Sequence, residues 1–305
     1  MTRKPVGKTT IGNCTVAIVG AGRLATFLAV ALNDAGFPIA EIVARDSARS
    51  RRRARFLAEK VGARAVIARS AALNVGLLWF CVPDREIRSA ASSVADHLPA
   101  RTSATGANVP GANVRFAFHS SGALLSQELE PLREAGAAVA SVHPLMTFVA
   151  GTHPSLAGVP FALEGDRTAT QMARRIVQEL GGESVFLSPS SKRAYHAWAT
   201  MASPLLLAFL VTLEEAARAA GLAPAEARRM SLPIVRQTLA NYSRLGAARS
   251  FSGPLVRGDA ETVAKHLAVL KKYPAACKVY VALAQEALRK LPVRNQYELK
   301  KLLLE

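Results

Sequence analysis

The sequence predicts an α/β fold, namely a doubly wound and mainly parallel sheet, followed by an all-helical second domain. Short apolar runs alternate with amphipathic helical segments through the first part of the chain, as expected for a parallel sheet covered on both faces. No strand pattern remains after Ser190, where Gly and Pro residues separate long helical segments. The 305 residues, half of them hydrophobic, suffice for two domains with sizeable cores.

The elements follow from apolar periodicity and from the turn residues between segments. We expect strands where short runs are almost continuously apolar, over residues 16–19, 39–44, 64–68, 75–82, 114–119, 137–142, 160–163 and 184–187. We expect helices over residues 23–35, 47–61, 85–97, 124–135, 167–180, 190–220, 224–243, 259–272 and 275–290. The predicted domains are therefore 14–188 and 189–305, preceded by a loose basic tail over 1–13.

The turn after the first strand has the sequence G-x-G-x-x-A and leads directly into a helix. Glycine at the first position permits a tight turn, and at the second it lets backbone N–H groups approach a pyrophosphate at the helix N-terminus. This context predicts a dinucleotide-binding turn, although a glycine turn that serves only packing gives the same pattern. The candidate cofactor-binding residues here are Gly20, Ala21, Gly22, Arg23 and Leu24.

The end of the second strand indicates which dinucleotide binds. Arg45 comes first and Ser47 follows two residues later, and a guanidinium group with a nearby hydroxyl suits the 2′-phosphate of NADP. Asp46 is the opposing observation, because an acid near this position is typical of NAD sites. We expect NADP as the cofactor, with Arg23 as a further phosphate ligand.

Polar or rigid residues also follow the later strands, and ligands of open α/β sheets bind at the carboxyl ends of strands. Val82 and Pro83 are candidates for the cofactor ribose, unless they only end the strand. His119 and Ser120 are candidates for the nicotinamide end, with Ser121 as a catalytic candidate. The alternative is that these hydroxyl groups cap the helix expected near residue 124.

Three basic side chains are candidates for acid catalysis. His143 follows a strand and is a candidate proton donor, although a structural histidine fits equally well. Lys192 and His196 lie four residues apart, on one face of the helix expected there. Lys192 would stabilise negative charge on a reacting carbonyl or imine, and the alternative is a solvated lysine. We expect Lys192→Ala to reduce turnover and to leave cofactor affinity nearly intact.

Composition bears on partners and location. The net charge of +17 and the arginine-rich segment 45–55 raise the possibility of nucleic-acid binding, but only Phe56 adjoins this segment and offers no stacking platform. The apolar run 197–213 is short for a membrane span and contains Pro204, so we expect a central helix of the helical domain. Three widely spaced cysteines have no metal or redox spacing, which indicates a reducing compartment, the cytoplasm.

Taken together, these motifs resemble a bacterial family of Rossmann-like proteins whose helical second domain is filed as domain-of-unknown-function 2520. Its layout is similar to that of pyrroline-5-carboxylate reductase, coenzyme-F420-dependent NADP reductases and β-hydroxyacid dehydrogenases. The matching segments are V-G-A-G-R-L-A at 19–25, V-P-D at 82–84, H-S-S-G-A-L at 119–124, H-P-L-M-T-F at 143–148, P-F-A-L-E-G-D at 160–166, K-R-A-Y-H-A-W-A at 192–199, G-P-L-V-R-G-D at 253–259 and H-L at 266–267.

The resemblance implies an NAD(P)-binding domain, a helical domain that commonly forms a homodimer, and an active site between them, with no substrate specified. Arg257 would then hold a substrate carboxylate, unless it belongs only to a turn that Asp259 caps. The family pattern A-S-N is replaced here by Ser203-Pro204, which puts catalytic competence in doubt.

We therefore expect an NADP-dependent oxidoreductase that transfers a hydride to a small carbonyl or imine compound. The alternative is a non-catalytic NAD(P)-binding protein, such as a redox sensor or an assembly partner. We expect no metal, because the sequence has no metal-binding motif.

Overall fold

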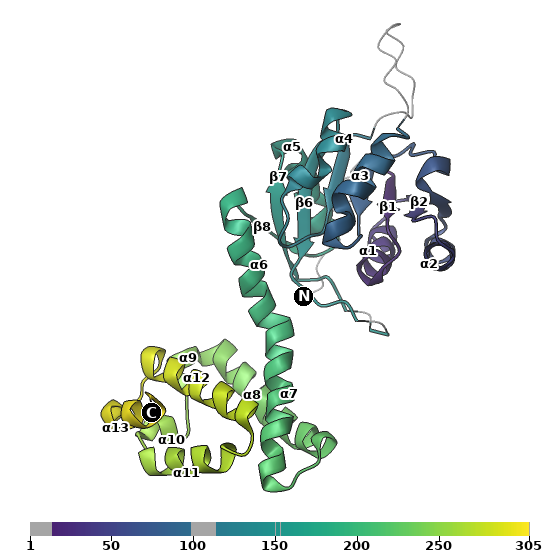
Figure 1. The fold of residues 1–305 in the computed structure, drawn as a ribbon. Helices are drawn as coiled ribbons and strands as arrows, with labels where there is room; N and C mark the ends of the chain where they lie inside the picture. The colour runs from purple at the N-terminus through teal and green to yellow at the C-terminus, as the bar shows by residue number, and fades with distance from the viewer. Residues whose placement is uncertain (1–13, 99–113, 150, 153, 305) are drawn as a thin grey trace, which may run out of the picture. The chain divides into compact units, whose positions relative to one another are not determined.

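The computed structural model describes residues 14–98, 114–149, 151–152 and 154–304, so the predicted tail over 1–13 lies outside the described residues. The chain divides into two compact units, one ending at Ala199 and the other beginning at Thr200 (Figure 1). The boundary predicted from the sequence lies at 188, whereas the first unit also includes most of helix α6 (Lys192–Thr200). Each unit is described by itself below.

The first unit contains an eight-stranded sheet with the order β3-β2-β1-β4-β5-β6-β7-β8. All neighbouring strands are parallel except β6 and β7, which confirms the predicted doubly wound and mainly parallel sheet. The strands are β1 (Val16–Val19), β2 (Ile39–Ala44), β3 (Arg64–Ile67), β4 (Leu77–Phe80), β5 (Phe116–His119), β6 (Ala138–Pro144), β7 (Pro160–Gly165) and β8 (Glu183–Phe186).

Helices cover both faces of this sheet (Figure 1). Helices α1 (Arg23–Asp34), α2 (Ala48–Val61) and α5 (Arg167–Glu179) pack on one face, against alternate strand residues such as Ile18 and Trp79. Helices α3 (Ile87–Ala95) and α4 (Glu130–Glu134) pack on the other face, against the intervening residues such as Val19 and Phe80. This alternation follows from the period of two in a strand and explains why the strands are mostly apolar on both faces.

The helix predicted over 124–135 is shorter in the structure. The chain forms a turn up to Leu125, then a 3₁₀ turn (Ser126–Leu129), and only then α4. The buried hydroxyl group of Ser121 accepts from the backbone N–H groups of Ala123 and Leu124, so these groups are satisfied without a helix. This hydroxyl therefore caps a turn rather than the predicted helix.

The second unit is all-helical, as predicted. Before α7 (Leu206–Ala217) lies a π-helical turn (Met201–Leu205) that contains Pro204. Proline interrupts regular helix geometry here because it has no N–H group to donate. The small core of the unit includes Val263, Leu288 and Leu299. The helices are α7 (Leu206–Ala217), α8 (Pro224–Leu245), α9 (Ala247–Ser250), α10 (Pro254–Arg257), α11 (Ala260–Leu270), α12 (Pro274–Lys290) and α13 (Gln296–Leu304). Helices α9, α10 and α13 were not predicted from the sequence.

Candidate active site

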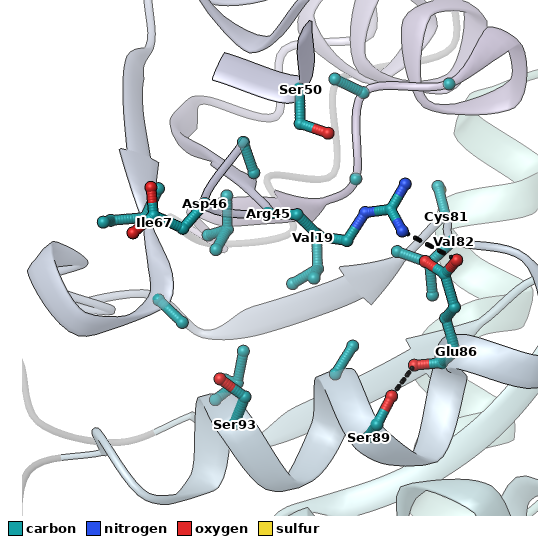
Figure 2. Close-up of a pocket in the computed structure, with 18 of the residues that line it drawn as sticks. Val19, Arg45, Asp46, Ser50, Ile67, Cys81, Val82, Glu86, Ser89 and Ser93 are labelled. Atoms are coloured by element: carbon teal, nitrogen blue, oxygen red, sulfur yellow. Dashed lines mark hydrogen bonds and ion pairs between the residues drawn. The ribbon is translucent and has the colours of Figure 1, made fainter. Parts of the chain in front are cut away.

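A cavity of about 630 Å³ lies at the carboxyl ends of β1, β2, β3 and β4 (Figure 2). Its volume lies within the usual range for small-molecule sites. The turn after β1 lines it, together with the loops after the other three strands and the exposed side of α3. This is the edge of the sheet at which open α/β folds bind their ligands.

The glycines of the first turn shape this cavity. Gly20 has φ +110°, and a Cβ atom there would lie 2.6 Å from the carbonyl oxygen of Cys81, so only glycine fits. Gly22 forms the N-cap of α1 and offers no side-chain hydrogen bond to the helix. The backbone N–H groups of the first turn of α1 are therefore left for a ligand. The turn and the cavity beside it fit the pyrophosphate of a dinucleotide.

Charged side chains surround the part of the cavity near β2. Arg45 forms an ion pair with Glu86 across the loop after β4, with an N–O distance of 2.9 Å (Figure 2). Asp46 accepts from Arg51 at 2.9 Å and from Arg69 at 3.0 Å. Both oxygens of Asp46 are thus engaged by guanidinium groups, which weakens the case for this carboxylate as a ribose ligand.

The predicted cofactor residues separate into two groups. Six of them line the cavity, namely Gly20, Ala21, Gly22, Arg45, Val82 and Pro83. Arg23 instead lines a wider groove along α1 and α2, and the Ser47 hydroxyl group caps α2 by accepting from the N–H group of Ser50 at 3.3 Å. Leu24 is part of the first turn of α1 and lines neither space.

His119 and Ser120 have structural contacts within the first unit. His119 is fully buried, and its two ring nitrogens bond to the Leu125 carbonyl oxygen and to the Ser121 N–H group. Burial lowers the pKa of His119 to about 4, so the ring is neutral at neutral pH. The Ser120 hydroxyl accepts from the indole N–H of Trp79 at 2.9 Å. These contacts position the loop after β5.

A second group of side chains lies farther along the same edge of the sheet, beyond β5 and β6. His143 Nδ1 and the hydroxyl oxygen of Tyr195 are 2.9 Å apart. The rings of His143 and His196 meet edge to face, with centroids 6.2 Å apart. A Cβ atom at Gly122 would lie 2.5 Å from His196 Cδ2 and 2.9 Å from His143 Nε2. Glycine at this position therefore allows both imidazole rings to approach the backbone. These four residues form what we call the imidazole cluster.

A buried turn supports the imidazole cluster. The hydroxyl group of Ser121 donates to Asp84 at 2.7 Å, and the Ser121 carbonyl oxygen accepts from both Ser141 and Lys192. Lys192 also donates to the Ser141 hydroxyl group. The Lys192 side chain is only 1% exposed, whereas the sequence analysis expected it beside a reacting carbonyl. This placement fits a side chain that positions the Ser121–Gly122 turn.

Burial and nearby charge shift the ionisation of this region. Burial lowers the pKa of His143 to about 4, with the Lys192 ammonium and His196 as smaller causes. Burial also lowers the pKa of Lys192 to about 8, partly opposed by Glu164 and Asp84. At neutral pH, His143 is therefore neutral and Lys192 is cationic.

Several residues of the site were missed by sequence reasoning. Tyr195 lies three residues after Lys192 on a helix, so the spacing that related Lys192 to His196 also pointed to it. Glu86 and Arg69 line the cavity from elements without a recognised motif, whereas Arg53 belongs to the arginine-rich segment 45–55. In the second unit, Asp259 caps α11 as predicted, accepting from the Thr262 N–H group at 3.0 Å, and Arg257 is exposed at the end of α10.

Comparisons with solved structures agree with this fold. A Bacteroides fragilis protein that carries the name NADP oxidoreductase superposes with a TM-score of 0.70 at 19% identity, over 90% of this chain and 97% of its own. An imine reductase from Myxococcus stipitatus, in complex with NADP⁺, gives 0.61 at 15% identity, over 90% and 94%. A pyrroline-5-carboxylate reductase from Coxiella burnetii gives 0.56 at 16% identity, over 90% and 98%. No curated protein sequence matches significantly.

Two family models together account for most of the chain. Residues 4–144 match a Rossmann-like domain. Residues 159–287 match a domain of unknown function, DUF2520, and this match begins at β7 of the sheet and extends into the helical unit. The chain is therefore similar to a Rossmann-like domain over its first part and to DUF2520 over its second.

Proposed function

We propose that this protein is an NADP-dependent oxidoreductase that transfers a hydride to a small carbonyl or imine compound. The observation that carries this proposal is the cavity around Gly20 and Gly22, which has an uncapped helix N-terminus on one side and arginine side chains on the other. The solved structures with the same fold include proteins named for NADP or bound to it. The three free cysteines suit a reducing, cytoplasmic location.

Each part of the first unit has a place in this proposal. The turn at Gly20–Gly22 would hold the pyrophosphate, with Val82 and Pro83 beside the ribose. Arg45 would bind the 2′-phosphate, and Arg53 and Arg69 line the same cavity and would add positive charge. Bound NADPH would supply the hydride. The imidazole cluster would bind the substrate, and Lys192 and Ser121 would position it.

Arg45 provides the first test. We expect wild-type protein to bind NADPH more tightly than NADH in calorimetry, because only NADPH carries the 2′-phosphate. Arg45→Ala should weaken NADPH binding by about 2 kcal/mol, roughly 30-fold, as for a lost charge-assisted contact, and leave NADH binding nearly unchanged. Arg49→Ala, on exposed α2 outside the cavity lining, is the matched control. If the wild-type protein bound neither NADPH nor NADH, the proposal of an NADP-dependent oxidoreductase would be wrong.

The second candidate function is that of a non-catalytic NAD(P)-binding protein, and one observation favours it. Pro204 occupies the place of the asparagine in the family pattern and lies in a π-helical turn, so it offers neither an amide nor a backbone donor. A protein of this kind would bind NADPH and consume none with 2-keto acids, ketones or cyclic imines. Measured NADPH oxidation with any of these compounds would exclude it.

We also propose that the helical unit forms a homodimer. Helix α7 has no buried residue, and α8 has one, Ala227, although both carry exposed large hydrophobic side chains. These side chains include Leu207, Val211, Met230, Ile234, Leu239 and Tyr242. An apolar surface of this kind marks an interaction site. The stretch Pro189–Ala220 is also long and apolar enough to cross a membrane, with only 6% of its most apolar window buried, so a lipid partner is the competing explanation.

A charged substitution on this apolar surface distinguishes a second copy of the chain from a lipid membrane as the partner. We expect wild-type protein to sediment as a dimer without detergent and Ile234→Glu to sediment as a monomer, because a buried carboxylate at an interface is costly. Arg236→Glu is the control, since it places the same charge on an exposed polar position of α8. A wild-type monomer that floats with liposomes would contradict the dimer.

A further inference from the structure

The His143–Tyr195 pair leaves one ring nitrogen of His143 without a partner. Nδ1 bonds to the Tyr195 hydroxyl group, and the two rings meet edge to face at 85°. No residue in the described part of the chain offers a hydrogen bond to Nε2. Among the described residues, Ser184 Oγ is the one fully buried side-chain N or O atom that has no hydrogen-bond partner. Nε2 of His143 also has no partner, so it is not fully buried. Nε2 therefore remains accessible to a ligand, beside Gly122.

The chemistry of the pair decides which nitrogen carries the proton. Burial raises the pKa of Tyr195 to about 12, so its hydroxyl group is protonated at neutral pH, while His143 is neutral because its pKa is about 4. A phenol O–H is a stronger donor than an imidazole N–H, and an imidazole nitrogen is a better acceptor than a phenol oxygen. Tyr195 therefore donates to Nδ1, and the proton of the ring lies on Nε2.

We propose that Tyr195 is a positioning residue that holds His143 as an Nε2–H donor, and that this donor binds the oxygen of a neutral carbonyl substrate in preference to a protonated iminium ion. The proposal rests on the proposed function and narrows its substrate class. A carbonyl oxygen has lone pairs that accept from Nε2–H, whereas the nitrogen of an iminium ion has none. Two carboxylates lie near Lys192 and both are bonded to serines, since Asp84 accepts from Ser121 and Glu164 accepts from Ser126.

During the reduction, the His143–Tyr195 pair delivers one proton to the carbonyl oxygen. As the carbonyl carbon gains a hydride from the reduced nicotinamide, the C=O electron pair moves to oxygen. The oxygen takes the Nε2 proton, and Tyr195 gives its own proton to Nδ1, which leaves an alcohol, a neutral His143 and a tyrosinate. The direction is favourable because an alkoxide is a stronger base than a phenolate. Solvent then supplies one proton to Nε2 while Nδ1 returns its proton to Tyr195, which restores the Nε2–H tautomer and the neutral phenol.

The tautomer can be measured without any nucleotide, so its outcome is independent of the proposed function. We expect ¹⁵N NMR of histidine-labelled protein to show His143 as the Nε2–H tautomer in the wild type and as a mixture in Tyr195→Phe, with His143→Gln providing the assignment. Tyr280→Phe is the matched control, because Tyr280 and His266 form the same kind of pair at 3.1 Å within the second unit. A wild-type Nδ1–H tautomer would overturn the proposal.

Kinetics test the substrate class once NADPH binding is established. With 2-keto acids and ketones, we expect Tyr195→Phe to lower kcat roughly 10- to 100-fold, because His143 is then no longer held with its proton on Nε2, where it donates to the transition state. The affinity for NADPH should be unchanged. His143→Gln, whose amide can donate, should retain more activity than His143→Ala. Turnover of a permanently charged N-methyl iminium compound that exceeds turnover of the matching ketone would contradict the proposal, even with tight NADPH binding.

Discussion

Gly122→Ala is expected to lower kcat/KM by roughly 100-fold or more, because it displaces the side chains that we propose to bind substrate. The added Cβ atom would lie 2.5 Å from His196 Cδ2 and 2.9 Å from His143 Nε2, distances at which at least one ring must move. His143 is fixed by Tyr195, so its movement breaks a hydrogen bond, and the methyl group also covers Nε2. Overpacking of this kind costs about 1–3 kcal/mol of stability.

Three measurements distinguish this effect from general damage. NADPH affinity should be nearly unchanged in Gly122→Ala, because Gly122 does not line the cavity around Gly20. Gly76→Ala is the control, since its Cβ would lie 3.2 Å from Cys14 Sγ at the opposite end of β4. Adding His196→Ala to Gly122→Ala removes the nearer clash and should recover part of the lost stability, because the contact with His143 remains. Full activity in Gly122→Ala would show that the imidazole cluster is not the substrate site.

The fold of the first unit was predictable because local patterns determine it. The strands are mostly apolar, and the helices between them have a clear period, so the parallel sheet with two covered faces follows from the sequence. The antiparallel pairing of β6 with β7 did not follow, because strand direction depends on the path of the connecting segment. The short helices α9 and α10, of four residues each, carry too little periodicity to be recognised.

The site was predictable in part, for a related reason. The glycine turn, Arg45, His119 and His143 lie at the carboxyl ends of strands, so the rule for that edge of a sheet identified them. The sequence did not reveal which polar groups satisfy one another. His119 and Ser121 match the pattern of active-site residues as well as His143 does, yet their polar atoms bond within the domain. Helix spacing alone places Tyr195 near the face of Lys192, but only its contact with His143 shows what Tyr195 does.

Lys192→Met is expected to preserve or increase stability while it lowers turnover at least about tenfold. The wild-type ammonium group is buried, and lowering its pKa from 10.5 to about 8 corresponds to roughly 3 kcal/mol spent on holding the charge at neutral pH. Methionine has a similar volume and removes this cost, although the bonds to the Ser121 carbonyl and the Ser141 hydroxyl are lost. The bond from Ser141 to Ser121 remains and limits the loss.

The pH dependence of the free energy of unfolding tests directly how much the buried charge of Lys192 lowers stability. Between pH 8 and 10.5, the unfolded chain binds the Lys192 proton and the folded chain does not, so the free energy of unfolding rises with pH in this window. Wild-type protein should therefore gain about 3 kcal/mol relative to Lys192→Met as the pH rises through the window, measured by urea unfolding of both proteins. Lys265→Met, at an exposed lysine of α11, is the control and should show no such difference. A constant difference between wild type and Lys192→Met would contradict the prediction.

A buried charge that lowers stability persists when function depends on it, and the contacts of Lys192 indicate how. Its ammonium group holds the carbonyl oxygen of Ser121, next to Gly122, and it is one of the charges that keep His143 neutral. In Lys192→Met, the pKa of His143 should rise toward its usual value and the turn should loosen, so turnover falls while NADPH affinity stays nearly intact. A variant with full turnover would leave the burial of this charge without a functional reason. Lower turnover with unchanged NADPH affinity would place Lys192 among the groups that position the imidazole cluster.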